Sequence, residues 1–461
     1  MISKRFLRAG PAPERTITKT SGVAAALVLA AAPLSLLAPA PAFAQAAPVA
    51  RAAPADAQYD SRSAINEFYR ARGGRPLWLA PQSGQAAQRM LGLLNSAAVD
   101  RLDPNRYRVQ WIAGALRAAS SGDPRAARHA EAALSQAFID YVRDLRRPPN
   151  VGIIYVDREL APSPPSARQL LDRAAASPSL ETFVSSMGWM NPAYAQLRRA
   201  LMMRQASPDE RARLTVNLER AAALPADDRR HVIVNVAAQR LDMVENGHVV
   251  DSMRVVVGKT NHPTPMMSAL IRAAALNPYW NVPPDLAAER IAPQVVKHGV
   301  GYLKSNGYQL LSDWSDRPSV VDPATVDWTA VAEGRVEVRI RQLPGPNNAL
   351  GQMKFVFPNA QGIFLHDTPE RQLLSEASRL YSGGCIRLED APRLGRWMFG
   401  RDLQKTGDAP EQIVPIPAAV PLYVTYLTAV PSSTGIAYFD DVYGRDASRM
   451  AALGGGQVAS R

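Results

Sequence analysis

The sequence is poor in cysteine, because Cys385 is the only one among its 461 residues. A single thiol cannot form a disulfide within the chain, so the fold does not depend on internal cross-links. A lone thiol has three possible roles, namely a small buried apolar side chain, a link to another molecule, or a reactive group.

Histidine is scarce as well, with six residues in the whole chain. His129, His231, His248, His262 and His298 are scattered, and none has a cysteine or carboxylate beside it at the spacing of a metal site. We therefore expect neither a metal nor an organic cofactor.

The chain also lacks a clean membrane span. Residues 22–44 are rich in Ala and Leu, but three prolines interrupt them, and the longest unbroken apolar piece is well short of the ~20 residues that a span needs. Because a basic leader precedes this run and Ala-Phe-Ala ends it, residues 1–44 are predicted to be a secretory signal peptide cleaved after Ala44. The alternative is an uncleaved anchor. After cleavage we expect an exported protein with no stable membrane span.

Acidic residues are fewer than basic ones, 41 against 53, and the formal net charge is +12. The lysines and arginines are scattered and do not form the dense runs of nucleic-acid-binding tails. Export also argues against nucleic acid as a partner. The composition fits a moderately basic soluble surface, which could meet an anionic wall polymer or lipid.

Periodicity divides the rest of the chain. Residues 45–59 are Ala/Pro-rich and are predicted to be a disordered tether, whereas residues 60–204 repeat apolar side chains at helical spacing. Residues 205–445 contain alternating and β-branched runs typical of strands, with an insertion or lid predicted at 281–335 and a flexible C-terminal tail at 446–461. The expected fold class is α+β, with an all-α domain followed by a β-rich domain.

Cys385 lies in the segment SRLYSGGCIRLED, nineteen residues after His366. His366 closes the predicted strand QGIFLHD, and the intervening loop is long enough to fold back and bring the thiol beside the imidazole. A base next to a thiol helps to form the thiolate, which is the species that attacks carbonyls. The pattern predicts a Cys–His pair.

Two glycines precede the thiol. Gly383 and Gly384 allow close approach to a substrate, and the amides of Gly384 and Cys385 are predicted to face a developing oxyanion. The segment CIRLEDAPRLGRWMF predicts a helix that starts at or just after Cys385, whose dipole would favour the thiolate. Arg387 is expected either to bind a substrate carboxylate or to brace the loop.

The segments FLHDTP and SGGCIRL, with eighteen residues between His366 and Cys385, resemble the signature of L,D-transpeptidases with a YkuD-type catalytic domain. Other segments between about 205 and 445, among them MRVVVGKTNHPTP, NPYWNVP and RQLPGPNNALGQMKFVFPN, resemble in order the long Gram-negative members. FYRARGGRPLW and RLDPNRY more weakly resemble their helical scaffold domain. The resemblance implies a scaffold domain at 60–204 and a catalytic domain at 205–445.

The resemblance implies a periplasmic enzyme that attacks peptidoglycan stems between meso-diaminopimelate and the terminal D-alanine. Cys385 would be the nucleophile, His366 the general base, and the backbone carbonyl of Asp367 the third catalytic element. The thioester on the cysteine would pass to the side-chain amine of a second stem, giving a 3-3 cross-link. Family members also use other acceptors, including a lipoprotein lysine, and carbapenems typically acylate the cysteine.

The remaining predicted site residues flank the thiol. Gly383 and Gly384 would supply backbone contacts, and Tyr381, Ser382 and Arg387 would contact the substrate. Many family members have histidine where this chain has Gly383. Long members often carry a peptidoglycan-binding module, of which residues 150–210 show no convincing copy, so anchoring is expected from the scaffold, the lid or a partner such as another periplasmic cell-wall enzyme.

Three alternatives follow from the same residues. If water resolves the thioester, the protein is an L,D-carboxypeptidase or a hydrolase that cuts cross-links. If it has lost activity, it is a wall-binding scaffold protein, although binding alone needs no thiol. A papain-like protease is disfavoured, because there the cysteine usually precedes the histidine, and here the order is reversed.

Overall fold

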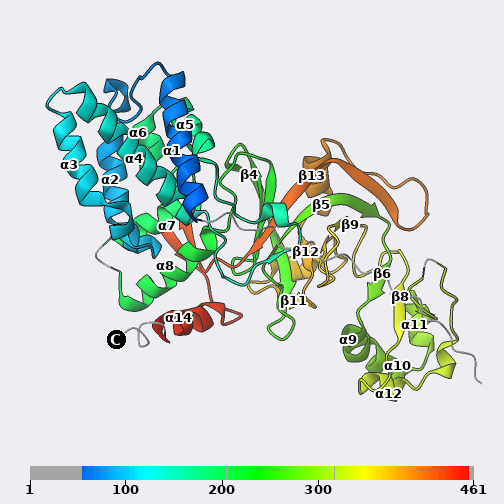
Figure 1. Cartoon of the computed structure of the whole chain (residues 1–461). Coiled ribbons are helices and arrows are strands. Elements are labelled where there is room, and N and C mark those ends of the chain that lie inside the picture. Colours follow the sequence, from blue (N-terminus) through cyan, green and yellow to red (C-terminus); the bar gives the residue numbers. More distant parts are fainter. Residues whose placement is uncertain (1–53, 204–205, 316, 456–461) are drawn as a thin grey trace, which may run out of the picture. The chain divides into compact units, whose positions relative to one another are not determined.

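The computed structural model describes residues 54–203, 206–315 and 317–455 (Figure 1). The predicted signal peptide and residues 45–53 of the predicted tether lie outside this range. Residues 54–59, which we predicted to be disordered, instead begin helix α1 (Pro54–Ala71). No helix in the described residues is both long enough and apolar enough to cross a membrane.

The first part of the chain is helical, as predicted. Helix α4 (Pro124–Leu145) illustrates why, because Asp123 caps its N-terminus, Pro124 fits its first turn, and apolar residues recur at three- and four-residue spacing on its buried face. Its core centres on Trp78, Phe138 and Tyr141, each at most 1 % exposed. The other α-helices of this part are α2 (Ala86–Asn95), α3 (Val109–Ala119), α5 (Ala167–Ala176), α6 (Leu180–Ser185), α7 (Pro192–Met202) and α8 (Pro208–Ala221).

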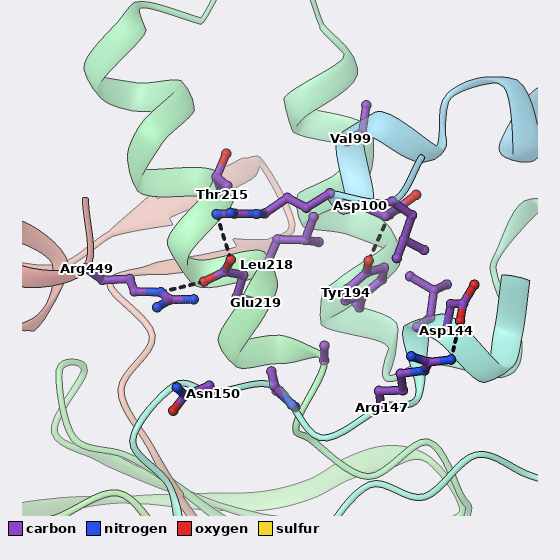
Figure 2. Close-up of a pocket in the computed structure, with 15 residues that line it drawn as sticks. Val99, Asp100, Asp144, Arg147, Asn150, Tyr194, Thr215, Leu218, Glu219 and Arg449 are labelled. Carbon is purple, nitrogen blue, oxygen red and sulfur yellow. Dashed lines mark hydrogen bonds and ion pairs between the residues drawn. The ribbon is translucent and has the colours of Figure 1, made fainter. Parts of the chain in front are cut away.

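A buried ion pair joins two elements of this helical part. The carboxylate of Asp100 accepts hydrogen bonds from Tyr141, Tyr194 and Arg198, at 2.7 to 3.0 Å. The side chains of Asp100 and Arg198 are 0 % and 3 % exposed. Figure 2 shows the Asp100–Tyr194 contact at the edge of a pocket that Glu219 and Arg449 also line.

Replacing Asp100 with alanine is expected to destabilise the protein by about 3–5 kcal/mol, because the Arg198 guanidinium would stay buried without its carboxylate. The control is Asp172→Ala, which breaks an exposed pair with Arg168, where the side chains are 50 % and 47 % exposed. That change should cost less than about 1 kcal/mol. Urea unfolding midpoints of the two variants test the difference, and equal shifts would contradict it.

The second part is built on one mixed sheet, which confirms the predicted β-rich domain. The strands run in the order β1-β5-β13-β2-β3-β4-β12-β10-β9, and β9 also pairs with β5, so the sheet closes on itself. Its interior is apolar, with Val255, Leu365, Ile386 and Leu422 fully buried. The strands are β1 (Ile154–Tyr155), β2 (His231–Asn235), β3 (Arg240–Glu245), β4 (His248–Gly258), β5 (Met267–Leu276), β9 (Met353–Val356), β10 (Leu365–His366), β11 (Leu380–Ser382), β12 (Ile386–Leu388) and β13 (Gln412–Thr425), with a separate hairpin of β14 (Ala429–Ser432) and β15 (Gly435–Tyr438).

The predicted insertion has a core and a sheet of its own, and Figure 1 shows its helices grouped with β6 and β8. It runs from β6 to β8, so it extends beyond residue 335. Strands β6 and β7 both pair with β8. Its elements are β6 (Trp280–Val282), α9 (Pro284–Leu286), a π-helical turn (Ala287–Ile291), α10 (Ala292–His298), α11 (Gly301–Ser305), β7 (Tyr308–Leu311), α12 (Trp328–Ala332) and β8 (Arg339–Gln342).

The expectation of a flexible tail from residue 446 is wrong for the residues that the structure describes there. Helix α14 (Arg445–Gly455) occupies them. Asp446 is 2 % exposed and is paired with Arg220 of α8, and Arg449 pairs with Glu219 at 2.8 Å. A buried carboxylate with a buried partner fixes the start of this helix.

Candidate active site

His366 ends strand β10 and Cys385 directly precedes strand β12, which pairs with β10 in parallel. In the pairing of β10 with β12, Leu365 lies opposite Ile386, and His366 lies opposite Arg387. Side chains alternate along a strand, so Leu365 and Ile386 point into the core, while Cys385, Arg387 and His366 share the other face. All three line one pocket of about 400 Å³.

The imidazole of His366 is held in one orientation and kept neutral. Its Nδ1 lies 2.5 Å from the carbonyl oxygen of Asp367. A carbonyl can only accept, so Nδ1 carries the hydrogen and Nε2 keeps the lone pair. Burial, followed by the positive charge of Arg387, lowers the pKa of His366 from 6.5 to about 3. The ring is therefore an uncharged base at neutral pH.

Gly351 leaves room for the Asp367 carboxylate, a role that sequence reasoning missed. The Asp367 carboxylate accepts from the Gln352 amide at 2.9 Å and from Arg371 at 2.8 Å. A Cβ on Gly351 would lie 2.4 Å from that carboxylate, and the φ of Gly351 is +62°. Only glycine fits on both counts, and its place in the turn-rich segment NNALGQ was the available signal.

The residues before the thiol form a braced turn. The Ser382 hydroxyl donates to the Cys385 carbonyl at 2.6 Å and accepts from the Gly384 amide at 3.1 Å. The predicted use of the Gly384 amide for an oxyanion therefore does not match this geometry, because that donor already has an acceptor. The Cys385 amide has no protein acceptor among residues 54–203, 206–315 and 317–455.

Thr264 also holds this turn in place through hydrogen bonds. Its buried hydroxyl donates to the Gly384 carbonyl at 2.8 Å and accepts from the Gly258 amide at 2.9 Å. Tyr443 donates to the Gly258 carbonyl at 2.6 Å. The sequence could not reveal these contacts, because Gly384 and Tyr443 lie far along the chain from Thr264.

Thr264→Val should destabilise the protein by about 1–3 kcal/mol, because it leaves a buried N–H and a buried carbonyl without partners. Thr215→Val is the matched control. The Thr215 hydroxyl bonds only within its own helix, to the Arg211 carbonyl at 2.8 Å. Thermal or urea unfolding measures both, and a Thr264 variant as stable as the control would show that the anchor is dispensable.

The helix expected at Cys385 is not there. Cys385 is followed by strand β12, and helix α13 (Ala391–Phe399) begins only where Asp390 caps it, with its side chain accepting from the Arg393 amide at 2.9 Å. A helix dipole acts within the first turn, so it does not favour the thiolate here. Burial raises the pKa of Cys385, against the smaller effects of a backbone hydrogen bond from Phe364 and the charge of Arg387. Cys385 is thus a neutral thiol at rest, which donates to the Gly362 carbonyl at 3.6 Å, in the same pocket as the neutral imidazole of His366.

Of the three residues predicted to contact substrate, only two line the pocket. Arg387 and Ser382 line the pocket, whereas Tyr381 does not and is 38 % exposed. The Arg387 side chain is 8 % exposed and pairs with Glu370 on the loop after His366. Of the two roles left open for Arg387, the structure therefore contains the loop brace.

The inserted segment supplies part of the pocket. Trp280, Pro283, Asp285, Leu286 and Arg290 all line it.

The described residues contain no cluster of three or more His, Cys, Asp or Glu side chains that could bind a metal.

Family comparisons agree with this architecture. The Scaffold domain family matches residues 63–201, and the YkuD family, described as the L,D-transpeptidase catalytic domain, matches residues 229–402. A relative from Haemophilus influenzae, named "Putative L,D-transpeptidase", is 29% identical over 283 residues, which are 59% of this chain and 56% of the relative. The match thus spans little more than half the relative's length.

Solved structures give only partial matches. An L,D-transpeptidase from Mycobacterium smegmatis shares 14% identity over 42% of this chain and 58% of its own, with a TM-score of 0.22. A mutant L,D-transpeptidase from Enterococcus faecium shares 12% identity over 44% and 52%, with a TM-score of 0.20. Overlaps this small say nothing further about the site. From the family matches, residues 229–402 are a YkuD-type L,D-transpeptidase catalytic domain, which follows a Scaffold domain at residues 63–201.

Proposed function

We propose that this protein is an exported peptidoglycan L,D-transpeptidase with Cys385 as nucleophile and His366 as general base. The observation that carries the proposal is the shared face of β10 and β12, where the thiol and a neutral imidazole line one pocket. The Asp367 carbonyl supports it further, because it leaves the Nε2 lone pair of His366 free to take a proton.

The chemistry runs in two halves. As Sγ of Cys385 attacks the diaminopimelate carbonyl, His366 takes the thiol proton, and a tetrahedral oxyanion forms. The Cys385 amide, which has no protein acceptor among the described residues, is a backbone donor available to that oxyanion. Collapse breaks the bond to D-alanine, whose amine leaves with the proton from His366, and a thioester remains.

The second half reverses the first. The side-chain amine of a second stem attacks the thioester, His366 takes a proton from that amine and returns it to sulfur, and a 3-3 cross-link is released. A neutral thiol and a neutral imidazole suit this order of steps, because the thiol proton moves to His366 only as the carbon–sulfur bond forms. Export to the periplasm rests on the predicted signal peptide at residues 1–44.

The test is to incubate the purified protein with disaccharide-tetrapeptide and follow the masses of the products. We expect a cross-linked dimer, with one D-alanine released for each bond formed. Tripeptide without dimer would favour the carboxypeptidase alternative. Unchanged tetrapeptide, with no acyl-enzyme mass, would contradict the proposal and favour an inactive wall-binding protein.

A further inference from the structure

Position 383 favours glycine for a reason other than its backbone conformation. Its φ is not in the left-handed region, unlike that of Gly384, which is +113°. A side chain at this position would instead press on Leu286 of the insertion. A Cβ on Gly383 would lie 2.8 Å from Cδ1 and 3.1 Å from Cδ2 of this leucine. Leu286 thus fills the space that a side chain at position 383 would take.

Leu286 is held firmly in this position. It is 6 % exposed and packs in the insertion core with Val282, Ile291 and Trp328. Two polar contacts tie the adjoining π-helical turn to the catalytic part. Glu289 lies 3.0 Å from Nε2 of His262, and Arg290 donates to the Tyr381 carbonyl at 3.4 Å.

This leucine forms an apolar wall beside the nucleophile. Leu286, Ile363 and Leu350 all line the pocket that contains Cys385, as do polar side chains such as Asp285, Arg290 and Lys354. A thioester on Cys385 can be resolved by water or by an amine. Apolar neighbours disfavour an ordered water, which needs about 30 Å³ of space and two to four polar partners. An amine that belongs to a bound stem peptide is positioned by the contacts of that peptide, so apolar surroundings disfavour it less than they disfavour water.

We propose that Leu286 determines reaction specificity by excluding water from the acylated Cys385, so that the thioester is transferred to an amine in preference to being hydrolysed. The inference rests on the proposed transpeptidase function and assigns the choice of acceptor class to a residue of the insertion. It also gives a structural reason for glycine at position 383, since a larger residue would push the leucine away.

The experiment measures the ratio of hydrolysed tripeptide to cross-linked dimer, with released D-alanine as the count of acylations. Leu286→Ala should raise this ratio about tenfold, because it opens room for water at the thioester. Leu286→Met, which keeps the volume, should stay near the wild-type ratio. The matched control is Leu303→Ala, because Leu303 is 2 % exposed in the same insertion core but does not line the pocket. Its ratio should also stay near wild type.

An unchanged ratio in Leu286→Ala, with D-alanine still released, would overturn this inference and leave the transpeptidase function standing. A wild-type protein that releases no D-alanine would overturn both. A second measurement does not depend on turnover. Gly383→Ala should lower the unfolding midpoint, and Leu286→Ala in the same chain should relieve much of that loss. Additive losses would show that the two residues do not press on each other.

Discussion

Cys385→Ala is expected to abolish covalent labelling of the protein by a carbapenem, measured by intact-mass spectrometry. The proposed mechanism needs a sulfur nucleophile, and Cys385 is the only thiol in the chain. The loss should reach the detection limit, consistent with the roughly 10⁴-fold or larger effects of removing a nucleophile. Dimer formation from tetrapeptide should disappear with it.

Ser382→Ala provides the matched comparison for this variant. It removes the two hydrogen bonds that brace the turn but keeps the thiol. Labelling should then be slower and still reach one adduct per chain. If the Cys385→Ala protein were labelled as fast as the wild type, the mechanism would be refuted, since the chain has no other cysteine to react.

His366→Gln should slow acylation of Cys385 by about 10²–10⁴-fold, because the thiol would lose its general base. The protein should remain folded, since glutamine is neutral and of similar length. A single adduct should still form after long exposure. Rates measured by quenched intact-mass time courses test this, and a rate within a fewfold of wild type would assign the base to another group.

The same variant should change how stability depends on pH. The unfolded histidine binds a proton near pH 6.5, whereas the folded one does so only at about 3. As pH falls through that window, the unfolded state takes up a proton that the folded state does not, so stability falls. The largest loss corresponds to about 5 kcal/mol, at 1.36 kcal/mol per pH unit.

Glutamine cannot take up this proton, so the His366→Gln protein should lose less stability between pH 6.5 and 4 than the wild type. His231 is present in both proteins, and burial lowers its pKa too, so part of the slope will remain. Urea midpoints at several pH values compare the two. Parallel curves would mean that His366 is not held neutral by the fold.

The sequence placed His366 at the end of a strand, as the structure has it, and Cys385 directly before β12, so the two residues line one pocket and their catalytic pairing stays a prediction. The switch from helices to strands was equally plain in the periodicity. Strand β5 has no clear signal in its own residues, because MSALIRAAAL carries three consecutive alanines, Ala273 to Ala275, which favour helix. Pairing with β13 and β9 overrides that preference, and such tertiary effects have no local signal.

Two further differences have distinct causes. The predicted helix began at Cys385, which is too early. Asp390 followed by Pro392 is the signal that marks the true start of the helix, five residues after Cys385. The occupied Gly384 amide was harder to foresee, because a serine side chain two residues earlier competes for it. The pairing of Asp446 with Arg220 joins residues 226 positions apart and has no trace in the sequence.

Strand β1 has a consequence for the edge of the catalytic sheet. Its two residues come from between α4 and α5, yet they pair with Met267 and Ser268 on β5. Nearby, Asp157 accepts from the Leu270 amide at 2.6 Å. Together they cover the stretch of the β5 edge that β9, paired only with Ala273 to Leu276, leaves open. Open strand edges recruit strands from other copies. Residues 154–157 therefore cover part of the β5 edge, and we expect a catalytic part expressed without them to aggregate.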